Sequence, residues 1–398
     1  MAAAGTARGA GEATPPRIGF EVRARACGGH ARRGRLWTAH GPVETPAFMP
    51  VGTYGAVKAM APWELEDLGA EMVLANAYHL ELRPGARYVA RRGGLHRFMG
   101  WDRAILTDSG GFQIFSLKDL RRVEESGVEF KSHIDGSRHR LRPEDVIEVQ
   151  ENLGVDVAMV LDECVAGDSS RSEVEAALAR TTRWARRSRE ARTRPDQQVF
   201  AIVQGGLDLA FRERSAGELA DLGFDGYAVG GLSVGEERQA TYEVARHTVA
   251  LLPEDRPRYL MGVGTPEELV RYTAMGFDLF DCVLPTRNAR NGMAFTSRGR
   301  IAIKNTTHRE DSGPLDPDCS CPACARFGRA YLRHLFVTNE ILAARALTTH
   351  NLHFYLSRMA RLRSALEEGR FQQEADAFLA ATSGGDAAVP SGGRELCS

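Results

Sequence analysis

Several stretches of the chain are apolar and rich in β-branched residues, and each of them stops at a polar residue or a glycine. They lie at 72–76, 104–111, 157–164, 199–206, 227–235, 259–265 and 279–286. Short, continuous apolar runs are typical of strands buried on both faces, as in parallel sheets. Segments with helical periodicity separate most of these runs, which indicates the β–α alternation of an α/β fold.

A further strand is expected at 45–52, ahead of these runs. With about eight β–α units, the pattern favours a closed (β/α)8 TIM barrel, in which catalytic groups sit at the carboxyl ends of the strands. The residues at which the runs stop should therefore meet at one mouth of the barrel. They are Asn76, Asp108, Asp162, Gln204, Gly231, Gly262 and Asp281. We expect Asn76 to support Asp281.

Three additions to the barrel are expected. Strands near 18–26 and 34–43 should form an N-terminal strand cap, and Asp135-Gly136 predicts a hairpin inserted after the third barrel strand. A zinc-binding subdomain should follow the barrel. The resulting division is a disordered tail at 1–16, the barrel catalytic region at 17–304, the zinc-binding subdomain and closing helices at 305–382, and a disordered tail at 383–398.

Composition limits the partners only weakly. A net charge of −1 over 398 residues gives no global signature of a nucleic-acid partner, so any RNA surface must be local. The apolar runs are too short to span a membrane. An odd number of cysteines, seven, without an export signal favours the cytoplasm. We interpret the arginine-rich segment 180–194 as the solvated face of an outer helix rather than as an RNA-binding patch.

A cluster of cysteines predicts a metal site. The segment GPLDPDCSCPAC contains a C-x-C-x2-C pattern made of Cys319, Cys321 and Cys324. With one imidazole, three thiolates form a standard tetrahedral set for structural zinc. We expect His350, at the end of the helix after Asn339, to be the fourth ligand. The competing histidines are His308, His334 and His353. Incidental buried cysteines are the alternative, which a hydrophilic loop disfavours.

The pattern predicts that Asp108 and Asp281 are the most accessible aspartates, because each lies at the end of a strand, near glycine or proline. Two carboxylates across one cleft can act as acid/base and nucleophile at a sugar anomeric carbon. The alternative is that each aspartate only caps a helix.

Other strand-end residues have the chemistry to bind a polar ring. The carboxylate of Asp162 suits a ring edge rich in donors, and Gln204 with the backbone N–H groups around Gly231 suits an acceptor. Phe112 and Met261 could sandwich the ring, although each taken alone fits a core position. From the residues alone, the chain is a barrel enzyme that handles a polar ring or a sugar, and its substrate stays open.

Longer motifs identify a family. They are TDSGGFQIFSL at 107–117, SHIDGSRHRLRPED at 132–145, LDEC at 161–164, IVQGG at 202–206, GGLSVGE at 230–236, YLMGVGTPEEL at 259–269, FDCVLPTRNARNG at 280–292 and REDSGPLDPDCSCPACARFGRAYLRHL at 309–335. Their sequence and order closely resemble bacterial tRNA-guanine transglycosylase, of the queuine tRNA-ribosyltransferase family. The resemblance covers roughly residues 17–380.

The resemblance implies exchange of guanine at the tRNA wobble position for 7-aminomethyl-7-deazaguanine, in queuosine biosynthesis. It makes Asp281 the nucleophile that attacks ribose C1′ and Asp108 the general acid/base. The implied substrate-binding residues are Ser109, Phe112, Asp162, Cys164, Gln204, Gly231, Leu232, Met261 and Gly262. Arg287 and Arg290 would contact the anticodon loop. Cys319, Cys321, Cys324 and His350 would bind one structural Zn²⁺ per subunit.

The resemblance also implies partners and a subtype. The expected partners are tRNA with a GUN anticodon, guanine and the aminomethyl precursor, and a second copy of the chain in a cytoplasmic homodimer. Val234 and Cys164 are similar to the bacterial form and favour the aminomethyl precursor over queuine. Two other hypotheses are a catalytically silent RNA-binding subunit, which the presence of both Asp108 and Asp281 disfavours, and a nucleoside hydrolase, which the PTRNAR motif and the zinc module disfavour.

Overall fold

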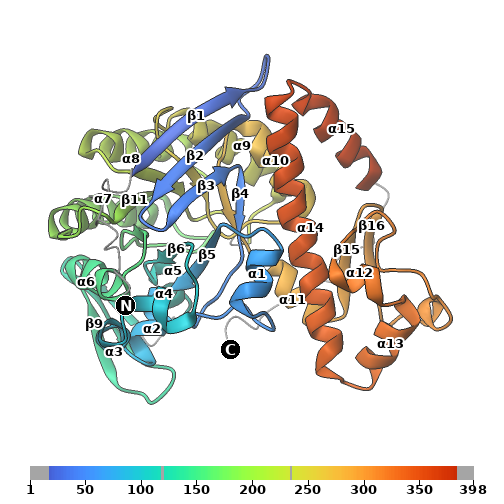
Figure 1. Cartoon of the computed structure of the whole chain (residues 1–398). Coiled ribbons are helices and arrows are strands. Elements are labelled where there is room, and N and C mark those ends of the chain that lie inside the picture. The colour runs from blue at the N-terminus through green and yellow to red at the C-terminus, as the bar shows by residue number, and fades with distance from the viewer. Residues whose placement is uncertain (1–17, 118–120, 234, 383–398) are drawn as a thin grey trace, which may run out of the picture.

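The barrel predicted from the sequence is confirmed. The computed structural model describes residues 18–117, 121–233 and 235–382. Its largest sheet has eight strands in the order β4-β14-β13-β12-β11-β10-β6-β5, and neighbouring strands in this order run parallel (Figure 1). The strands are β4 Ala47–Met49, β5 Met72–Asn76, β6 Ala104–Asp108, β10 Val157–Met159, β11 Gln198–Val203, β12 Gly226–Val229, β13 Arg258–Leu260 and β14 Leu279–Asp281.

The sheet closes on itself just past β4. Gly52 donates its backbone N–H to the carbonyl of Leu74 at 2.7 Å, and Leu74 donates to the carbonyl of Pro50 at 3.0 Å. These two bonds join the extension of β4 to β5, which are the first and last strands of the sheet order. Closure leaves no free sheet edge.

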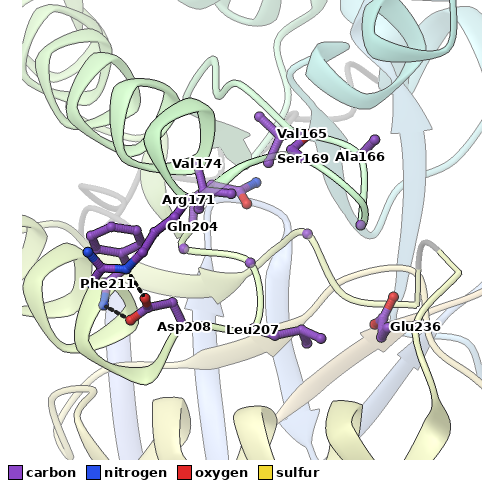
Figure 2. A pocket seen from close by; sticks show the side chains of 14 residues that line it. Val165, Ala166, Ser169, Arg171, Val174, Gln204, Leu207, Asp208, Phe211 and Glu236 are labelled. Carbon is purple, nitrogen blue, oxygen red and sulfur yellow. Dashed lines mark hydrogen bonds and ion pairs between the residues drawn. The ribbon is translucent and has the colours of Figure 1, made fainter.

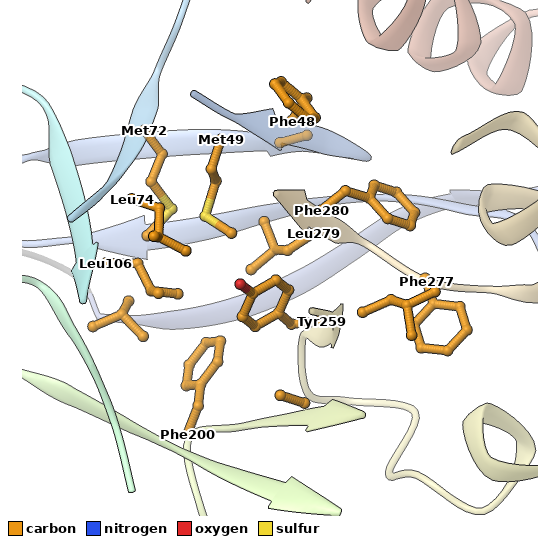
Figure 3. Packing of buried hydrophobic residues seen from close by; sticks show 14 of the residues in the cluster. Phe48, Met49, Met72, Leu74, Leu106, Phe200, Tyr259, Phe277, Leu279 and Phe280 are labelled. Carbon is orange, nitrogen blue, oxygen red and sulfur yellow. The ribbon is translucent and has the colours of Figure 1, made fainter. Parts of the chain in front are cut away.

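Alternation along the strands fills the barrel interior. Figure 3 shows Leu74, Leu106, Tyr259 and Leu279 among the side chains that meet there, together with Phe200. Each of these residues is buried, with at most 4% of its surface exposed. Because side chains on a strand alternate between two faces, the residue two positions further along each strand also faces the interior, but nearer the mouth.

Helices cover the outside of the barrel. They are α1 Pro62–Asp67, α2 Ala77–Leu82, α3 Ala86–Arg91, α4 Gly94–Met99, α5 Gly111–Ser116, α6 Pro143–Leu153, α7 Arg171–Ala191, α8 Leu209–Leu222, α9 Arg238–Ala250, α10 Pro266–Met275 and α11 Leu284–Arg290. Local signals explain their starts. Proline occupies the first turn of α6 and α10, where no N–H partner is needed, and the hydroxyl of Ser170 caps α7 in a capping box with Glu173.

The arginines of α7 lie on the outer surface, as expected, but most of them are ion-paired rather than simply solvated. Arg183 binds Glu125 at 2.6 Å, and Arg187 binds Glu144 at 2.7 Å. Arg192, just after the helix, binds Asp225 at 2.8 Å. These arginines therefore connect α7 to its neighbours.

The N-terminal cap is an antiparallel sheet of β1 Gly19–Arg25, β2 Arg32–Thr38 and β3 Gly41–Thr45. Arg32 anchors it to the barrel: its Nε donates to Asp278 Oδ1 at 2.9 Å, and both side chains are fully buried. The inserted hairpin is also present, with a third strand that the sequence did not predict. Its strands are β7 Arg121–Glu124, β8 Gly127–Lys131 and β9 Arg138–Leu141.

The C-terminal part differs in detail from the expectation. After the pair β15 Met293–Thr296 and β16 Gly299–Ala302 come η2 Thr306–His308, α12 Pro322–Arg326, α13 Arg329–Val337, α14 Ile341–Glu367 and α15 Phe371–Thr382. The closing helices expected in this region are therefore α12 to α15. Two of the breaks between them fall at Asn339 and Gly369, whose φ angles of 58° and 69° are incompatible with a continuing helix. The predicted tails lie outside the described residues.

No helix among the described residues is long and apolar enough to cross a membrane. Helix α14 lies along the barrel beside β4 and α11, and it links the barrel to the cysteine-containing region (Figure 1).

Candidate active site

Alternation within the barrel brings the predicted aspartates to its mouth. Asp108 is two residues beyond the inward-facing Leu106, and Asp281 is two residues beyond Leu279. By the same alternation, Asn76 follows Leu74 on β5. These side chains therefore line one end of the barrel interior.

Asp108 is held by two amide side chains. Asn76 Nδ2 donates to Asp108 Oδ2 at 2.6 Å, and Gln113 Nε2 donates to the same oxygen at 3.1 Å. The expectation that Asn76 supports Asp281 is wrong, because the register of β5 and β6 places Asn76 directly opposite Asp108. Within the described part of the chain, Asp108 Oδ1 and Gln113 Oε1 are buried and have no hydrogen-bond partner.

Asp281 has a different environment. Its Oδ1 accepts a hydrogen bond from the hydroxyl of Tyr259 at 2.6 Å and another from the backbone N–H of Gly262 at 2.7 Å. Gly262 has a φ of 72°, a left-handed conformation that glycine adopts without strain. Two donors on one oxygen fix the carboxylate and favour its charged form.

The two aspartates consequently titrate differently. Burial, with a contribution from the charge of Asp281, raises the pKa of Asp108 to about 8. Burial also raises the pKa of Asp281, but the Gly262 N–H and the Tyr259 hydroxyl oppose that rise. A site with two carboxyl groups whose pKa values are pushed apart can hold one as an acid and the other as a nucleophile.

Asp162 and Gln204 form a polar pair beside this centre. Gln204 Nε2 donates to Asp162 Oδ2 at 2.7 Å, and the hydroxyl of Ser109 lies 3.4 Å from Asp162 Oδ1. Burial raises the pKa of Asp162 to about 6. The Asp162 carboxylate lies close to the backbone of Gly111. A glycine permits this contact, because a Cβ at position 111 would lie 2.4 Å from Asp162 Oδ1.

Gly231 and Arg212 shape the loops around this pair. A Cβ on Gly231, whose φ is 64°, would lie 2.4 Å from Gln204 Oε1, so only glycine fits at that position. Arg212 is fully buried and donates to the carbonyls of Val203 and Gly230 at 2.8 and 2.9 Å, which ties the loops after β11 and β12 together. Arg212 was not among the predicted site residues, because an arginine on an outer helix looks solvent-exposed.

A cavity of about 270 Å³ adjoins Gln204 and Gly231. Figure 2 shows the side chains around it, which come from the loops after β10, β11 and β12 and from the starts of α7 and α8. Arg171 and Asp208 form an ion pair at 2.9 Å on its rim. Gln204, which binds Asp162, therefore also lines this cavity.

The remaining predicted residues lie near the mouth in different settings. Phe112, on α5, is 39% exposed, whereas Leu232 and Cys164 are buried. Met261 directly follows β13 and is partly buried. Arg287 and Arg290 are exposed on α11. Val234 lies outside the described residues.

The cysteine cluster assembles a metal-binding set. The ligand atoms of Cys319, Cys321, Cys324 and His350 all lie within 4.8 Å of one another. His350 is fully buried, in the third turn of α14 rather than at the end of the helix as expected. His350 Nε2 lies 2.7 Å from the carbonyl of Phe295, and His350 Nδ1 lies 3.2 Å from Cys324 Sγ.

This set fits a metal ion. A hydrogen bond from Nε2–H to Phe295 would leave the lone pair of Nδ1 facing the three sulfurs, which is the usual support for a metal-binding histidine. Among the competing histidines, His353 comes closest, with Nδ1 at 3.4 Å from Cys319 Sγ.

Comparisons with known proteins agree with the geometry. The model of the queuine tRNA-ribosyltransferase family matches residues 27–384. A queuine tRNA-ribosyltransferase from Solidesulfovibrio magneticus is 57% identical over 345 residues, which is 86% of this chain and 92% of that protein. Another from Pelotomaculum thermopropionicum is 57% identical over 349 residues, covering 88% of this chain and 94% of the relative.

Proposed function

The chain belongs to the queuine tRNA-ribosyltransferase family, whose reaction exchanges guanine in tRNA, and we propose that it performs this exchange with Asp281 as nucleophile and Asp108 as acid/base. The observation that carries the assignment is the contrast between the two carboxyl groups. Asp281 receives two hydrogen bonds that favour its charge, while Asp108 has a pKa of about 8 and stays protonated near neutral pH.

The first half-reaction breaks the glycosidic bond of guanine 34. Asp281 attacks ribose C1′, the C1′–N9 bond breaks, and its electron pair leaves with the base. Asp108 gives its proton to the departing guanine, so neutral guanine and a ribosyl ester of Asp281 result. Burial holds that proton on Asp108 until the base accepts it.

The second half-reaction runs in reverse with a new base. The deprotonated Asp108 takes the proton from N9 of 7-aminomethyl-7-deazaguanine, N9 attacks C1′, and Asp281 leaves. Two displacements restore the original configuration at C1′. One N-glycosidic bond replaces another, so the exchange needs no energy source.

The base is held by the polar pair and its neighbours. We assign Asp162 to the N1–H and N2–H₂ edge of the ring, with Gln204 and the backbone around Gly231 at the O6 side. Ser109 orients Asp162, and Leu232, Cys164 and Gly262 complete the pocket wall. Phe112 and Met261 stack on the two ring faces, and Arg287 and Arg290 bind the anticodon loop.

The metal is Zn²⁺ in this proposal, one ion per subunit, held by Cys319, Cys321, Cys324 and His350. With four protein ligands the ion would have no open position for water, so its role is structural. The ion would connect helix α14 to the loop that precedes α12, and would thereby fix the region next to α11.

The biological setting follows the family resemblance. We propose that the tRNA carries a GUN anticodon, that the incoming base is the aminomethyl precursor, and that the enzyme acts in the cytoplasm as a homodimer.

An apolar surface supports the dimer. Trp63, Val337 and Ile341 are 66%, 49% and 81% exposed, and an Arg345–Glu64 ion pair brings α1 beside the start of α14. Exposed apolar groups in such a cluster are typical of interfaces.

One assay tests the central assignment. Wild-type protein should incorporate labelled guanine into tRNA and form an adduct that survives denaturation. Asp281→Asn should do neither, while still binding tRNA. Full exchange by that variant would remove Asp281 from the mechanism. Release of free base without exchange would instead favour a nucleoside hydrolase, and tRNA binding without exchange by the wild type would favour a silent subunit.

A further inference from the structure

The outer face of the inserted hairpin carries an excess of positive charge. Because directly opposed residues share a face, the registers Arg122↔Glu129↔Arg140 and Lys131↔Arg138 place five exposed side chains on that face. Four of them are basic and one is acidic, and the half-buried Glu124 on the same face pairs with Arg122 at 3.1 Å. Within the described residues, no ion pair joins Lys131, Arg138 or Arg140 to a carboxylate.

One feature of this face is unfavourable for the isolated hairpin. Lys131 and Arg138 are directly opposite each other, where the Cβ atoms of paired residues are about 5 Å apart and like charges destabilise a sheet. Arg140 is directly opposite Glu129, and the nearby Asp145 is bound by Arg142 at 2.7 Å, so the unbalanced charge of this face centres on Lys131 and Arg138. A binding partner with regularly spaced negative charges would relieve this repulsion.

The opposite face of the hairpin fixes it in place. Val128, Phe130 and Leu141 are buried in a cluster with Ile114 and Trp184. In addition, Trp184 Nε1 donates to the carbonyl of Glu125 at 2.8 Å, between β7 and β8. The basic face is therefore presented by a packed element.

The hairpin also lies beside the mouth of the barrel. His133, in its turn, is 3.1 Å from the hydroxyl of Tyr78, and its ring packs against His79 with the centroids 5.7 Å apart. Tyr78 and His79 lie two and three residues after Asn76, which binds Asp108. In Figure 1 the hairpin projects on one side of the mouth, and α11 with the cysteine-containing region lies on the other.

We propose that Lys131, Arg138 and Arg140 form a second contact for the tRNA, on its sugar–phosphate backbone outside the exchanged nucleotide. This inference rests on the proposed function, because that function brings a polyanion to the mouth. Successive exposed residues on one strand are about 6.7 Å apart, so the three cations form a compact array that can follow a backbone. Contacts of this kind position the RNA and carry no sequence information.

The test is the salt dependence of tRNA binding. In the variant Lys131→Gln/Arg138→Gln/Arg140→Gln, the slope of log affinity against log salt should be shallower by about two, since each phosphate contact contributes about 0.7–0.9. KM for tRNA should rise about tenfold, while kcat and KM for guanine stay unchanged. The variant Lys131→Arg/Arg138→Lys/Arg140→Lys, which keeps all three positive charges, should have the wild-type slope.

A control variant removes the same charge elsewhere. Arg186, Arg246 and Arg271 are exposed on the outer helices α7, α9 and α10. Arg186→Gln/Arg246→Gln/Arg271→Gln should leave the slope at the wild-type value. If the hairpin variant has the same salt slope as this control, the inference is overturned. It is also overturned if the wild-type hairpin binds anionic vesicles but the hairpin variant still binds tRNA with wild-type affinity. Absence of guanine exchange in the wild type would overturn the proposed function instead.

Discussion

Tyr259→Phe tests how the barrel prepares Asp281 for attack. The substitution removes the hydroxyl that donates to Asp281 Oδ1 at 2.6 Å and keeps the buried ring. The Gly262 N–H, at 2.7 Å, remains as the second donor. The perturbation is therefore confined to one hydrogen bond on the nucleophile.

The size of the effect follows from the charge of the acceptor. A hydrogen bond to a charged group contributes about 1.5–3 kcal/mol, and each 1.36 kcal/mol corresponds to one pKa unit. The Tyr259 hydroxyl lowers the pKa of Asp281, so its removal should raise that pKa by about one to two units. Asp281 attacks as the carboxylate, and the acidic limb of the kcat profile should move to higher pH by that amount.

The measurement is kcat and KM for guanine exchange as a function of pH, together with the yield of the denaturation-resistant adduct. On the acidic limb kcat should fall roughly 10- to 100-fold, with KM for tRNA unchanged. Tyr227→Phe is the matched control. Tyr227 is a buried tyrosine on the neighbouring β12, and its hydroxyl accepts from the backbone N–H of Phe224 at 3.2 Å, away from the aspartates. A Tyr259→Phe profile that overlays that of Tyr227→Phe would refute the reasoning.

Three further predictions use other parts of the site. Asp108 has a pKa of about 8 in the folded protein, against about 4 for an unfolded aspartate. Between these pH values the folded state binds one more proton than the unfolded state, so the stability of the fold decreases as pH rises through this range. Asp108→Asn should therefore raise the melting temperature at pH 8 while abolishing exchange, and wild-type exchange should decline above about pH 8. Removing the metal with a chelator should release about one zinc ion per chain by elemental analysis, and Cys321→Ser should abolish that zinc and lower the melting temperature. Gly231→Ala should raise KM for guanine at least tenfold with little change in tRNA affinity, because the new Cβ would lie 2.4 Å from Gln204 Oε1; an unchanged KM would show that the base does not bind there.

The residues that can face the barrel interior follow from local sequence patterns. Apolar runs that end at Asp108, Asp281 and Gln204 predicted strands, and alternation along a strand then sets which side chains point inward. The cysteine spacing likewise indicated a metal-binding set. These features are local, because each depends on the order of residues within a few positions, and the barrel and the Cys3His cluster both occur as predicted.

Only the tertiary structure decided which side chains meet. Asn76 binds Asp108 because β5 pairs with β6, and Tyr259 binds Asp281 because β13 pairs with β14. Tyr259 looks like an ordinary core residue in the sequence, and Arg212 looks like part of a solvated helix face. Their partners come close only when neighbouring strands of the barrel pair. The physical reason is that strand pairing is a non-local interaction, whereas the alternation that aims each side chain is local.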